Sequence, residues 1–387
     1  MNNFELYNPT NLIFGKDQIK KLSTLVPKNS RILLAYGGGS IKKNGIYDQV
    51  MEALKGFEVV EFSGIEPNPR FETLEKGIEI IKKNDLNFIL AVGGGSVIDG
   101  VKFMSAATKF EGDKKDILQK KMLLTNLDDV IPFGTVLTLP ATGSEMNSGA
   151  VVTINETQEK LSFGGSALFP KFSICDPTVI ESLPARQIQN GVVDAYTHVL
   201  EQYLTYQHNA YLQDRIAEGI LQTLIEVGPK VVENPTDYIL ASNFMWCCTM
   251  ALNGLLNKGV PTDWVTHMIG HELTALYEID HARTLAIVGP HLYKTMFETK
   301  KEKLAQYGKR IFHLHGSDDE IAEEAINKTT EFFHTMGIKT KLSEYTSDYE
   351  NTASFIGDRF EKRGWSALGE RKNITPEKVR KIVSDCY

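Results

Sequence analysis

The sequence predicts two domains: an α/β N-terminal domain with a mostly parallel sheet, and an all-helical C-terminal domain. Three observations lead to this prediction. Short β-rich runs alternate with helical stretches in the first half, β-branched runs disappear beyond Leu183-Pro184, and two glycine-rich strings follow strand candidates. Alternating strands and helices are typical of a parallel sheet whose faces are covered by helices.

The strand candidates of the first half are short and rich in β-branched or aromatic residues. They are RILLAY (31–36), FEVVEF (57–62), FILAV (88–92), GTVLTLP (134–140) and FSICD (172–176). Between them, apolar residues recur at helical spacing in IYDQVMEAL (46–54) and RFETLEKGIEIIKK (70–83).

The second half shows long helical periods instead. They cover residues 185–206, 210–228, 237–257, 262–277, 282–297, 300–313 and 318–336. We therefore place the domain boundary near residue 184, which gives domains of residues 1–183 and 184–387.

Composition and charge narrow the class of protein. The chain has 387 residues and a net charge of -7, so no basic excess exists to neutralise the phosphates of a nucleic acid. No apolar run reaches the roughly 18 residues of a membrane helix, and the N-terminus does not resemble a signal peptide. The four cysteines form no CxxC pair, which favours a reducing, cytoplasmic location. We expect a small-molecule partner, with no nucleic acid and no membrane.

Two GGGS strings follow strand candidates. Gly37, Gly38, Gly39 and Ser40 follow the strand at 31–36, and Gly93, Gly94, Gly95 and Ser96 follow the strand at 88–92. Glycine lets backbone N–H groups approach a phosphate, and a helix N-terminus adds a favourable dipole. Neither string has the third glycine of the dinucleotide fingerprint. One such string alone is as readily a tight turn, but two at parallel strand ends favour a nucleotide site.

A third strand end is polar. TLPATGSEMNSGAV offers the side chains of Thr138, Thr142, Ser144 and Asn147 to a ligand. Alone, such a run is more often a solvated loop. Because it follows a strand of the same predicted sheet, it belongs to the carboxyl edge where open α/β sheets bind ligands.

The first loop bears on the choice of nicotinamide coenzyme. NAD sites commonly place a carboxylate against the ribose 2′-OH. Here Gly39 and Ser40 are followed by Lys42 and Lys43, with no carboxylate among them. Positive charge suits a 2′-phosphate, so the two lysines favour NADP(H). An equally good interpretation is that they lie in the solvent-exposed first turn of a helix and bind no ligand.

Histidines and one aspartate suggest a metal centre in the second half. Asp194 and His198 stand four apart on the side of a predicted helix away from its main apolar stripe, and His267 and His271 repeat this spacing. His281 follows after a short break. One carboxylate with imidazoles suits Fe²⁺ or Zn²⁺, and the spacing alone leaves His271 among the candidate ligands.

Motifs along essentially the whole chain resemble the iron-containing, or group III, alcohol dehydrogenase family. They are the GGGS strings, GGGSVIDGVK, TLPATGSEMN, GVVDAYTHVLEQY, GVPTDWVTHMIGHELTALYEIDHARTLAIV and the near-terminal LGE. Within the family the chain most resembles the branch of NADPH-dependent butanol dehydrogenases and broad-specificity aldehyde reductases. The resemblance implies the architecture shared with dehydroquinate synthase-like proteins, a nucleotide domain followed by a helical metal domain.

The resemblance also implies roles for individual residues. The metal ligands would be Asp194, His198, His267 and His281, with His271 near the site and available for proton transfer. The implied coenzyme contacts are Gly37, Gly38, Ser40, Gly94, Gly95, Ser96, Asp99, Thr138, Thr142 and Lys160. Family members that use NAD often have Asp at the position of Gly39, which agrees with the charge argument for NADP(H).

The expected activity is therefore metal-dependent hydride transfer between NADP(H) and a primary alcohol or aldehyde such as butanol or butanal. A homodimer is implied by the family. A glycerol dehydrogenase-like enzyme is a close alternative. A dehydroquinate synthase-like lyase would need a basic cluster around its metal, and the predicted metal helices carry few cations. A non-catalytic nucleotide-binding protein is the third alternative, and the intact set of candidate ligands argues against it.

Overall fold

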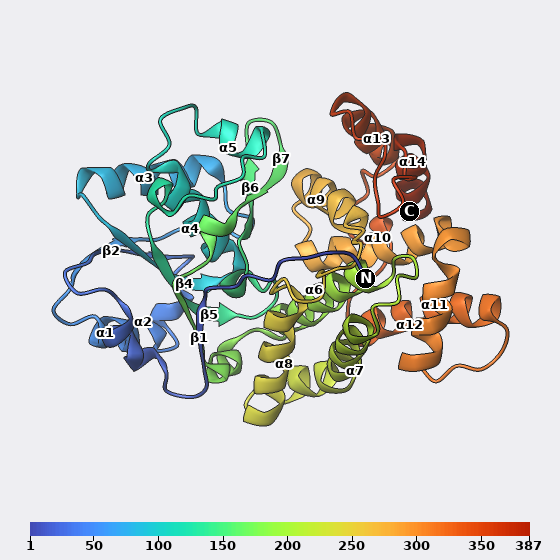
Figure 1. The fold of residues 1–387 in the computed structure, drawn as a ribbon, viewed down its shortest axis with the longest axis horizontal. Coiled ribbons are helices and arrows are strands. Elements are labelled where there is room, and N and C mark those ends of the chain that lie inside the picture. Colours follow the sequence, from blue (N-terminus) through green and yellow to red (C-terminus); the bar gives the residue numbers. More distant parts are fainter. The chain divides into compact units, whose positions relative to one another are not determined.

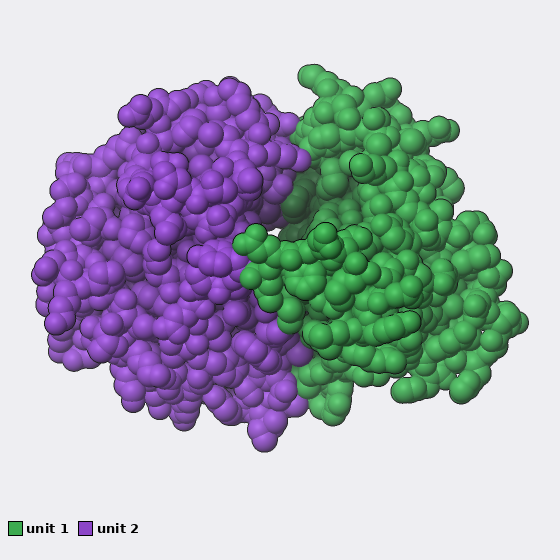
Figure 2. Space-filling model, viewed as in Figure 1, with its two compact units in different colours: residues 1–6, 185–233, 254–387 green, residues 7–184, 234–253 purple.

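The computed structural model describes residues 1–387, and its chain folds as two compact units. One unit, here called the sheet unit, contains residues 7–184 and 234–253. The other, here called the helical unit, contains residues 1–6, 185–233 and 254–387. Figure 2 colours the two units separately. The predicted division into a dinucleotide-binding domain of residues 1–183 and a helical metal-binding domain of residues 184–387 stays a prediction.

The sheet unit is built on six parallel strands in the order β1-β8-β5-β4-β2-β3. Strands β1, β2, β4 and β5 of this sheet are labelled in Figure 1. The strands are β1 (Asn11–Phe14), β2 (Arg31–Tyr36), β3 (Glu58–Phe62), β4 (Phe88–Gly94), β5 (Phe133–Leu139) and β8 (Phe172–Cys175). The interior strands β2 and β4 are nearly continuous runs of buried apolar residues, as expected for strands covered on both faces.

Helices and a hairpin complete the sheet unit. Its helices are α1 (Leu22–Leu25), α2 (Ile46–Ala53), α3 (Phe71–Lys83), α4 (Gly95–Ala107), α5 (Lys115–Gln119) and α8 (Tyr238–Ala251). The antiparallel hairpin pairs β6 (Gly149–Ile154) with β7 (Glu159–Gly164). Helix α4 packs against β4, β5 and β6, and nearly all of its residues are buried, which explains why most of them are apolar or small.

The helical unit contains the remaining helices. They are α6 (Ala185–Tyr203), α7 (Tyr211–Glu233), α9 (Val265–Tyr277), α10 (His281–Thr295), α11 (Phe297–Ile311), α12 (Asp318–Thr335), α13 (Thr352–Lys362) and α14 (Pro376–Asp385). Helix α10 lies at the centre, where it contacts α6, α9, α11, α12 and α14. None of the helices in the chain combines the length and the apolar character needed to cross a membrane.

The structure confirms the predicted fold class, a parallel α/β region followed by a helical region. The five strand candidates correspond to β2, β3, β4, β5 and β8. The sequence analysis did not predict β1, the β6–β7 hairpin, α13 and α14. Strand β1 has only four residues and lies at the sheet edge, so it carries little pattern of its own.

Candidate active site

Three helices of the helical unit bring an aspartate and two histidines together. Asp194 lies on α6, His267 on α9, and His281 is the first residue of α10. One potential ligand atom from each lies within 4.8 Å of the others. Because α10 packs against both α6 and α9, residues far apart in the sequence meet at one point.

His198 lies beside this group, although it is not one of the three. Its Nδ1 is 3.7 Å from Asp194 Oδ2, and its ring stacks on that of His267 with centroids 4.5 Å apart. Burial lowers the pKa of His198 to about 4, so its ring is neutral at pH 7. A neutral imidazole is the form that binds metals.

The spacing of these donors fits one metal ion. The His281 Nε2 to Asp194 Oδ1 distance is 3.8 Å, and both histidine–aspartate distances exceed hydrogen-bond length. Two ligands bound tetrahedrally at roughly 2.1 Å from one ion are about 3.4 Å apart. A carboxylate with imidazoles is a donor set that suits Fe²⁺ or Zn²⁺.

His271 lies close to the group but is not one of the three. Its ring centroid lies 5.0 Å from that of His281 and 6.2 Å from that of His267. Among the nearby aromatic residues, Trp264 packs against the rings of His198 and His267. The Tyr277 hydroxyl instead donates to the Asp348 carbonyl, and Trp246 belongs to the sheet unit.

A carboxylate that the sequence analysis missed lies behind His267. Glu201, on α6, contacts Nδ1 of His267 through Oε2 and is 1% exposed as a side chain. Glu201 follows His198 by three residues, which places both on neighbouring positions of α6. Only the folded structure brings Glu201 into contact with His267 of α9.

In the sheet unit, the predicted coenzyme residues gather at one edge of the sheet. Strands β5, β4 and β2 are parallel neighbours, so the loops after their carboxyl ends lie at the same edge. Gly37 to Ser40 follow β2, and Thr142, Ser144 and Asn147 follow β5, whereas Thr138 lies within β5. The second GGGS string runs directly from β4 into α4 as predicted.

This junction requires glycine. A Cβ on Gly94 would lie 2.9 Å from Leu139 Cβ, and one on Gly95 would lie 2.3 Å from Thr142 Oγ1. The tight approach brings the loop after β5 against the first turn of α4. The backbone N–H groups of that turn are the feature that favours a phosphate.

Asn68 links two predicted coenzyme residues. Its backbone N–H donates to Ser96 Oγ at 3.2 Å, and its side-chain oxygen accepts from Lys160 Nζ at 2.9 Å. Asn68 has a left-handed backbone (φ 57°) in the sequence PNP, a turn signal that the sequence analysis did not use.

Asp99, Ser144 and Asn147 form an internal clamp around Lys102. Lys102 is fully buried and donates to Ser144 Oγ at 2.8 Å and to Asn147 Oδ1 at 3.0 Å. Ser144 in turn donates to Asp99 Oδ1 at 2.6 Å. Burial lowers the pKa of Lys102 to about 8, and it raises the pKa of Asp99. These side chains hold α4 to the loop after β5.

The first loop differs from expectation in one respect. The sequence analysis found no carboxylate there, but the structure places Glu61 of β3 2.9 Å from Lys42 Nζ. The Tyr36 and Tyr47 hydroxyls also donate to Glu61, each at 2.5 Å. These hydrogen bonds, that of Tyr36 foremost, lower the pKa of Glu61 to about 2, so Lys42 faces an ionised carboxylate.

Comparisons with known proteins identify the family. A model described as iron-containing alcohol dehydrogenase matches residues 9–177, and one described as Fe-containing alcohol dehydrogenase family, C-terminal, matches residues 188–387. The chain belongs to the iron-containing alcohol dehydrogenase family. The resemblance inferred from the motifs is therefore confirmed.

Relatives within the iron-containing alcohol dehydrogenases cover the whole chain. The NADPH-dependent aldehyde reductase YqhD of Escherichia coli K12 is 48% identical over 99% of each chain. A probable NADH-dependent butanol dehydrogenase of Bacillus subtilis is 42% identical, also over 99% of each chain. A crystal structure of the E. coli protein YqhD matches with a TM-score of 0.96 and 46% identity, and the match covers 100% of this chain and 99% of that chain.

Proposed function

We propose that this chain is a metal-dependent alcohol dehydrogenase or aldehyde reductase that transfers hydride between NADP(H) and a primary alcohol or aldehyde. The observation that carries the proposal is the meeting of Asp194, His267 and His281 in a chain of this family. Butanol and butanal represent the substrate class, because relatives named as butanol dehydrogenases and as an aldehyde reductase match nearly the whole chain.

Asp194, His198, His267 and His281 would hold one divalent ion, Fe²⁺ or Zn²⁺. When bound, such an ion acts as a Lewis acid that polarises a carbonyl group and lowers the pKa of an alcohol. Asp194 is buried (3% exposed) and, as a carboxylate, would supply negative charge that reduces the net charge of the ion. The three helices fix the spacing of the donors, so the site forms only when the helical unit is folded.

The sheet unit would bind the coenzyme. The N–H groups around Gly94, Gly95 and Ser96 would face its phosphates at the start of α4. Gly37, Gly38, Gly39 and Ser40 would take the adenosine end, with Lys42 near its 2′-phosphate, and Lys160 is held by Asn68. Thr138 and Thr142 add hydroxyls at the same edge, which Asp99, Ser144 and Asn147 stabilise from within.

His271 would carry the proton. Its half-buried imidazole lies beside His281, and an imidazole has one nitrogen that can donate a proton and one that can accept it. Reduction of an aldehyde consumes one proton for each hydride transferred, and water and the coenzyme ribose are the other routes by which that proton could reach the product.

The test uses purified protein freed of metal and then loaded anaerobically with Fe²⁺ or Zn²⁺. Loss of NADPH absorbance after butanal is added should depend on the metal and should stop with a chelator. The variants Asp194→Ala and His267→Ala should lose tight metal binding and turnover together, whereas His315→Ala, an exposed histidine on another segment, should lose neither.

The same assay separates the alternatives. Oxidation of glycerol with NAD in preference to any aldehyde reaction would favour the glycerol dehydrogenase-like function. Metal and coenzyme binding without turnover of any aldehyde or alcohol would favour a lyase or a binding-only protein. Full activity of metal-depleted Asp194→Ala would reject the proposed centre.

We further propose a cytoplasmic homodimer. All four cysteines are buried and free of disulfides, which suits a reducing compartment. In the sheet unit, β1 ends the sheet, and Ile239 and Trp246 of α8 are 71% and 42% exposed. An open edge and exposed apolar side chains are features that a second copy would cover. Light scattering after size-exclusion chromatography tests the mass, and a monomer at micromolar concentration would reject the dimer.

A further inference from the structure

Glu201 makes an unusual set of contacts for a buried carboxylate. Its Oε1 accepts the backbone N–H of Thr266 at 2.7 Å, and its Oε2 accepts the backbone N–H of His267 at 3.3 Å. The same Oε2 contacts Nδ1 of the His267 ring. One side chain of α6 therefore holds both the backbone and the imidazole of a candidate metal ligand on α9.

We propose that Glu201 is the positioning residue that fixes the ring of His267 so that Nε2 faces the metal. The inference rests on the metal site proposed above and adds a residue to it. A carboxylate on Nδ1 keeps the proton on that nitrogen, which leaves Nε2 with the lone pair that binds a metal. It also prevents rotation of the ring and makes the other nitrogen a stronger donor.

A buried ionic network holds Glu201 in place from behind. The Glu201 carbonyl accepts the N–H of Asp263 at 2.9 Å, and Asp263 Oδ1 accepts the N–H of Val265 at 3.1 Å. Lys300 Nζ lies 2.6 Å from Asp263 Oδ2 and 3.1 Å from Glu370 Oε1. The Lys300, Asp263 and Glu370 side chains are all at most 3% exposed.

This network connects the near-terminal LGE motif, which ends at Glu370, to the start of α9. It gives α9 a rigid first turn, and His267 lies in that turn. Rigid support is what a metal ligand needs, because small displacements of a ligand weaken the site.

A purely structural role for Glu201 makes a different prediction. A carboxylate that accepts N–H groups at the first turn of α9 stabilises the helix whether or not it touches the ring. In that case its loss would lower stability without a specific effect on metal binding.

The variant Glu201→Gln separates the two roles. With its amide oxygen towards Thr266, the NH₂ group would donate to Nδ1 of His267 and drive the ring proton onto Nε2. With the amide reversed, the NH₂ group would meet the Thr266 N–H. Either arrangement disturbs the ring or its support while the side-chain volume stays the same.

The measurement is Zn²⁺ affinity of metal-free protein, from competition with a chromophoric chelator. Glu201→Gln should bind Zn²⁺ about tenfold to a hundredfold more weakly than wild type. The visible spectrum of the Co²⁺ form should also change. NADPH binding, followed by its fluorescence, should not change, because the predicted coenzyme residues lie in the sheet unit.

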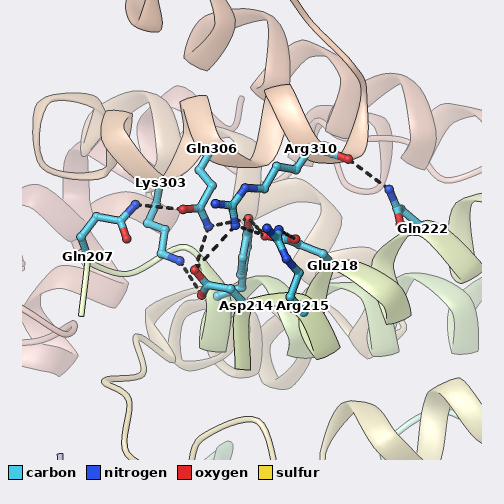
Figure 3. Close-up of polar contacts among 9 residues, drawn as sticks. Gln207, Asp214, Arg215, Glu218, Gln222, Lys303, Gln306 and Arg310 are labelled. Atoms are coloured by element: carbon cyan, nitrogen blue, oxygen red, sulfur yellow. Dashed lines mark hydrogen bonds and ion pairs between the residues drawn. The ribbon is translucent and has the colours of Figure 1, made fainter. Parts of the chain in front are cut away.

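Glu218→Gln is a matched control. Glu218 is also a carboxylate of the helical unit whose side chain is only 7% exposed, but it contacts Tyr203, Arg215 and Arg310. It belongs to the polar cluster between α7 and α11 in Figure 3. Its replacement should leave Zn²⁺ affinity and the Co²⁺ spectrum as in wild type. An equal loss in both variants would overturn the proposal.

Glu201→Asp is the second variant, and it carries the test if Glu201→Gln does not fold. It keeps the charge on a side chain one methylene shorter, so its Zn²⁺ affinity should lie between those of wild type and Glu201→Gln. If Glu201→Gln does not fold, the expected result is a Zn²⁺ affinity of Glu201→Asp below that of wild type. Wild-type Zn²⁺ affinity in either folded Glu201 variant overturns the positioning role. If instead wild type itself binds no Zn²⁺, or Asp194→Ala binds it equally well, the proposed metal centre fails and not only the role of Glu201.

Discussion

The role of Lys42, in the loop after β2, depends on a neighbouring side chain of β3. Lys42 faces the ionised Glu61 of β3, and a 2′-phosphate would compete with that carboxylate for the same ammonium group. Lys42→Ala should raise the KM for NADPH by about tenfold, because a charge-assisted hydrogen bond is lost, and leave the KM for NADH little changed. Steady-state kinetics with each coenzyme measure both values.

Lys43→Ala is the control for Lys42, since the two exposed lysines are adjacent and Glu61 pairs with Lys42. It should change neither KM. Equal weakening of NADPH and NADH by Lys42→Ala would show that Lys42 supports the loop and does not recognise the phosphate.

Lys102 should make stability depend on pH in the alkaline range. Burial lowers its pKa from 10.5 to about 8 in the folded protein, so between these values the unfolded chain binds more protons. Stability therefore rises with pH there, by up to about 1.4 kcal/mol per pH unit for one proton. The difference in unfolding free energy between wild type and Lys102→Met, from urea titrations, should shift in favour of wild type from pH 8 to 10.5. A constant difference would contradict the assignment.

At the scale of single residues, the sequence allows a site residue to be predicted in two cases. Either its partner lies one helical turn away, or the residue belongs to a familiar motif. Asp194 and His198 share a face of α6, and that pairing follows from periodicity. Glu201, Glu61 and Lys102 were not predicted as site residues, because each gains its role from a contact made by tertiary packing.

Among the elements, the glycine loops allow a paired test of coenzyme binding. A Cβ on Gly38 would meet nothing within 4 Å, whereas one on Gly95 would lie 2.3 Å from Thr142 Oγ1. Gly38→Ala should therefore leave stability nearly unchanged and weaken NADPH binding if a coenzyme lies against the loop. Gly95→Ala should also cost about 1–3 kcal/mol of stability through overpacking.

Thermal unfolding and NADPH fluorescence measure the two effects separately. Unaltered NADPH affinity in Gly38→Ala would place the coenzyme away from the first loop.

Long elements with clear periods were predictable and short or mixed ones were not. Helices α6 to α12 follow apolar repeats over three or more turns. The β6–β7 hairpin follows the polar loop after β5, and the polar run TLPATGSEMNSGAV extends into the first residues of β6, which hides the start of that strand. Helices α13 and α14 lie in a segment rich in charged residues. Only a few residues of each helix are apolar and buried, Val379, Ile382 and Val383 in α14, so the helical repeat is short.

For the whole molecule, metal should act on stability through the helical unit. The candidate ligands lie on α6, α9 and α10, so a bound ion ties together helices that are far apart in the chain. Free Zn²⁺ at about a hundred times its dissociation constant should stabilise the fold by about 2.7 kcal/mol. Calorimetry with and without a chelator measures the shift in melting temperature, and Asp194→Ala should show none. A similar shift in Asp194→Ala would mean that Zn²⁺ binds elsewhere.

The sheet unit is discontinuous in the chain, since α8 joins it only after α6 and α7 have been made. Thr249 of α8 donates to the buried Glu145 at 2.6 Å, and Asn147 donates to the Leu252 carbonyl at 3.3 Å. During synthesis on the ribosome, the loop after β5 therefore waits for its partner helix for several seconds at ordinary elongation rates. Until then the segments that α8 contacts in the folded chain, residues 177–182 and 144–146, lack their cover, and surface left uncovered in this way makes a partly folded chain prone to aggregate.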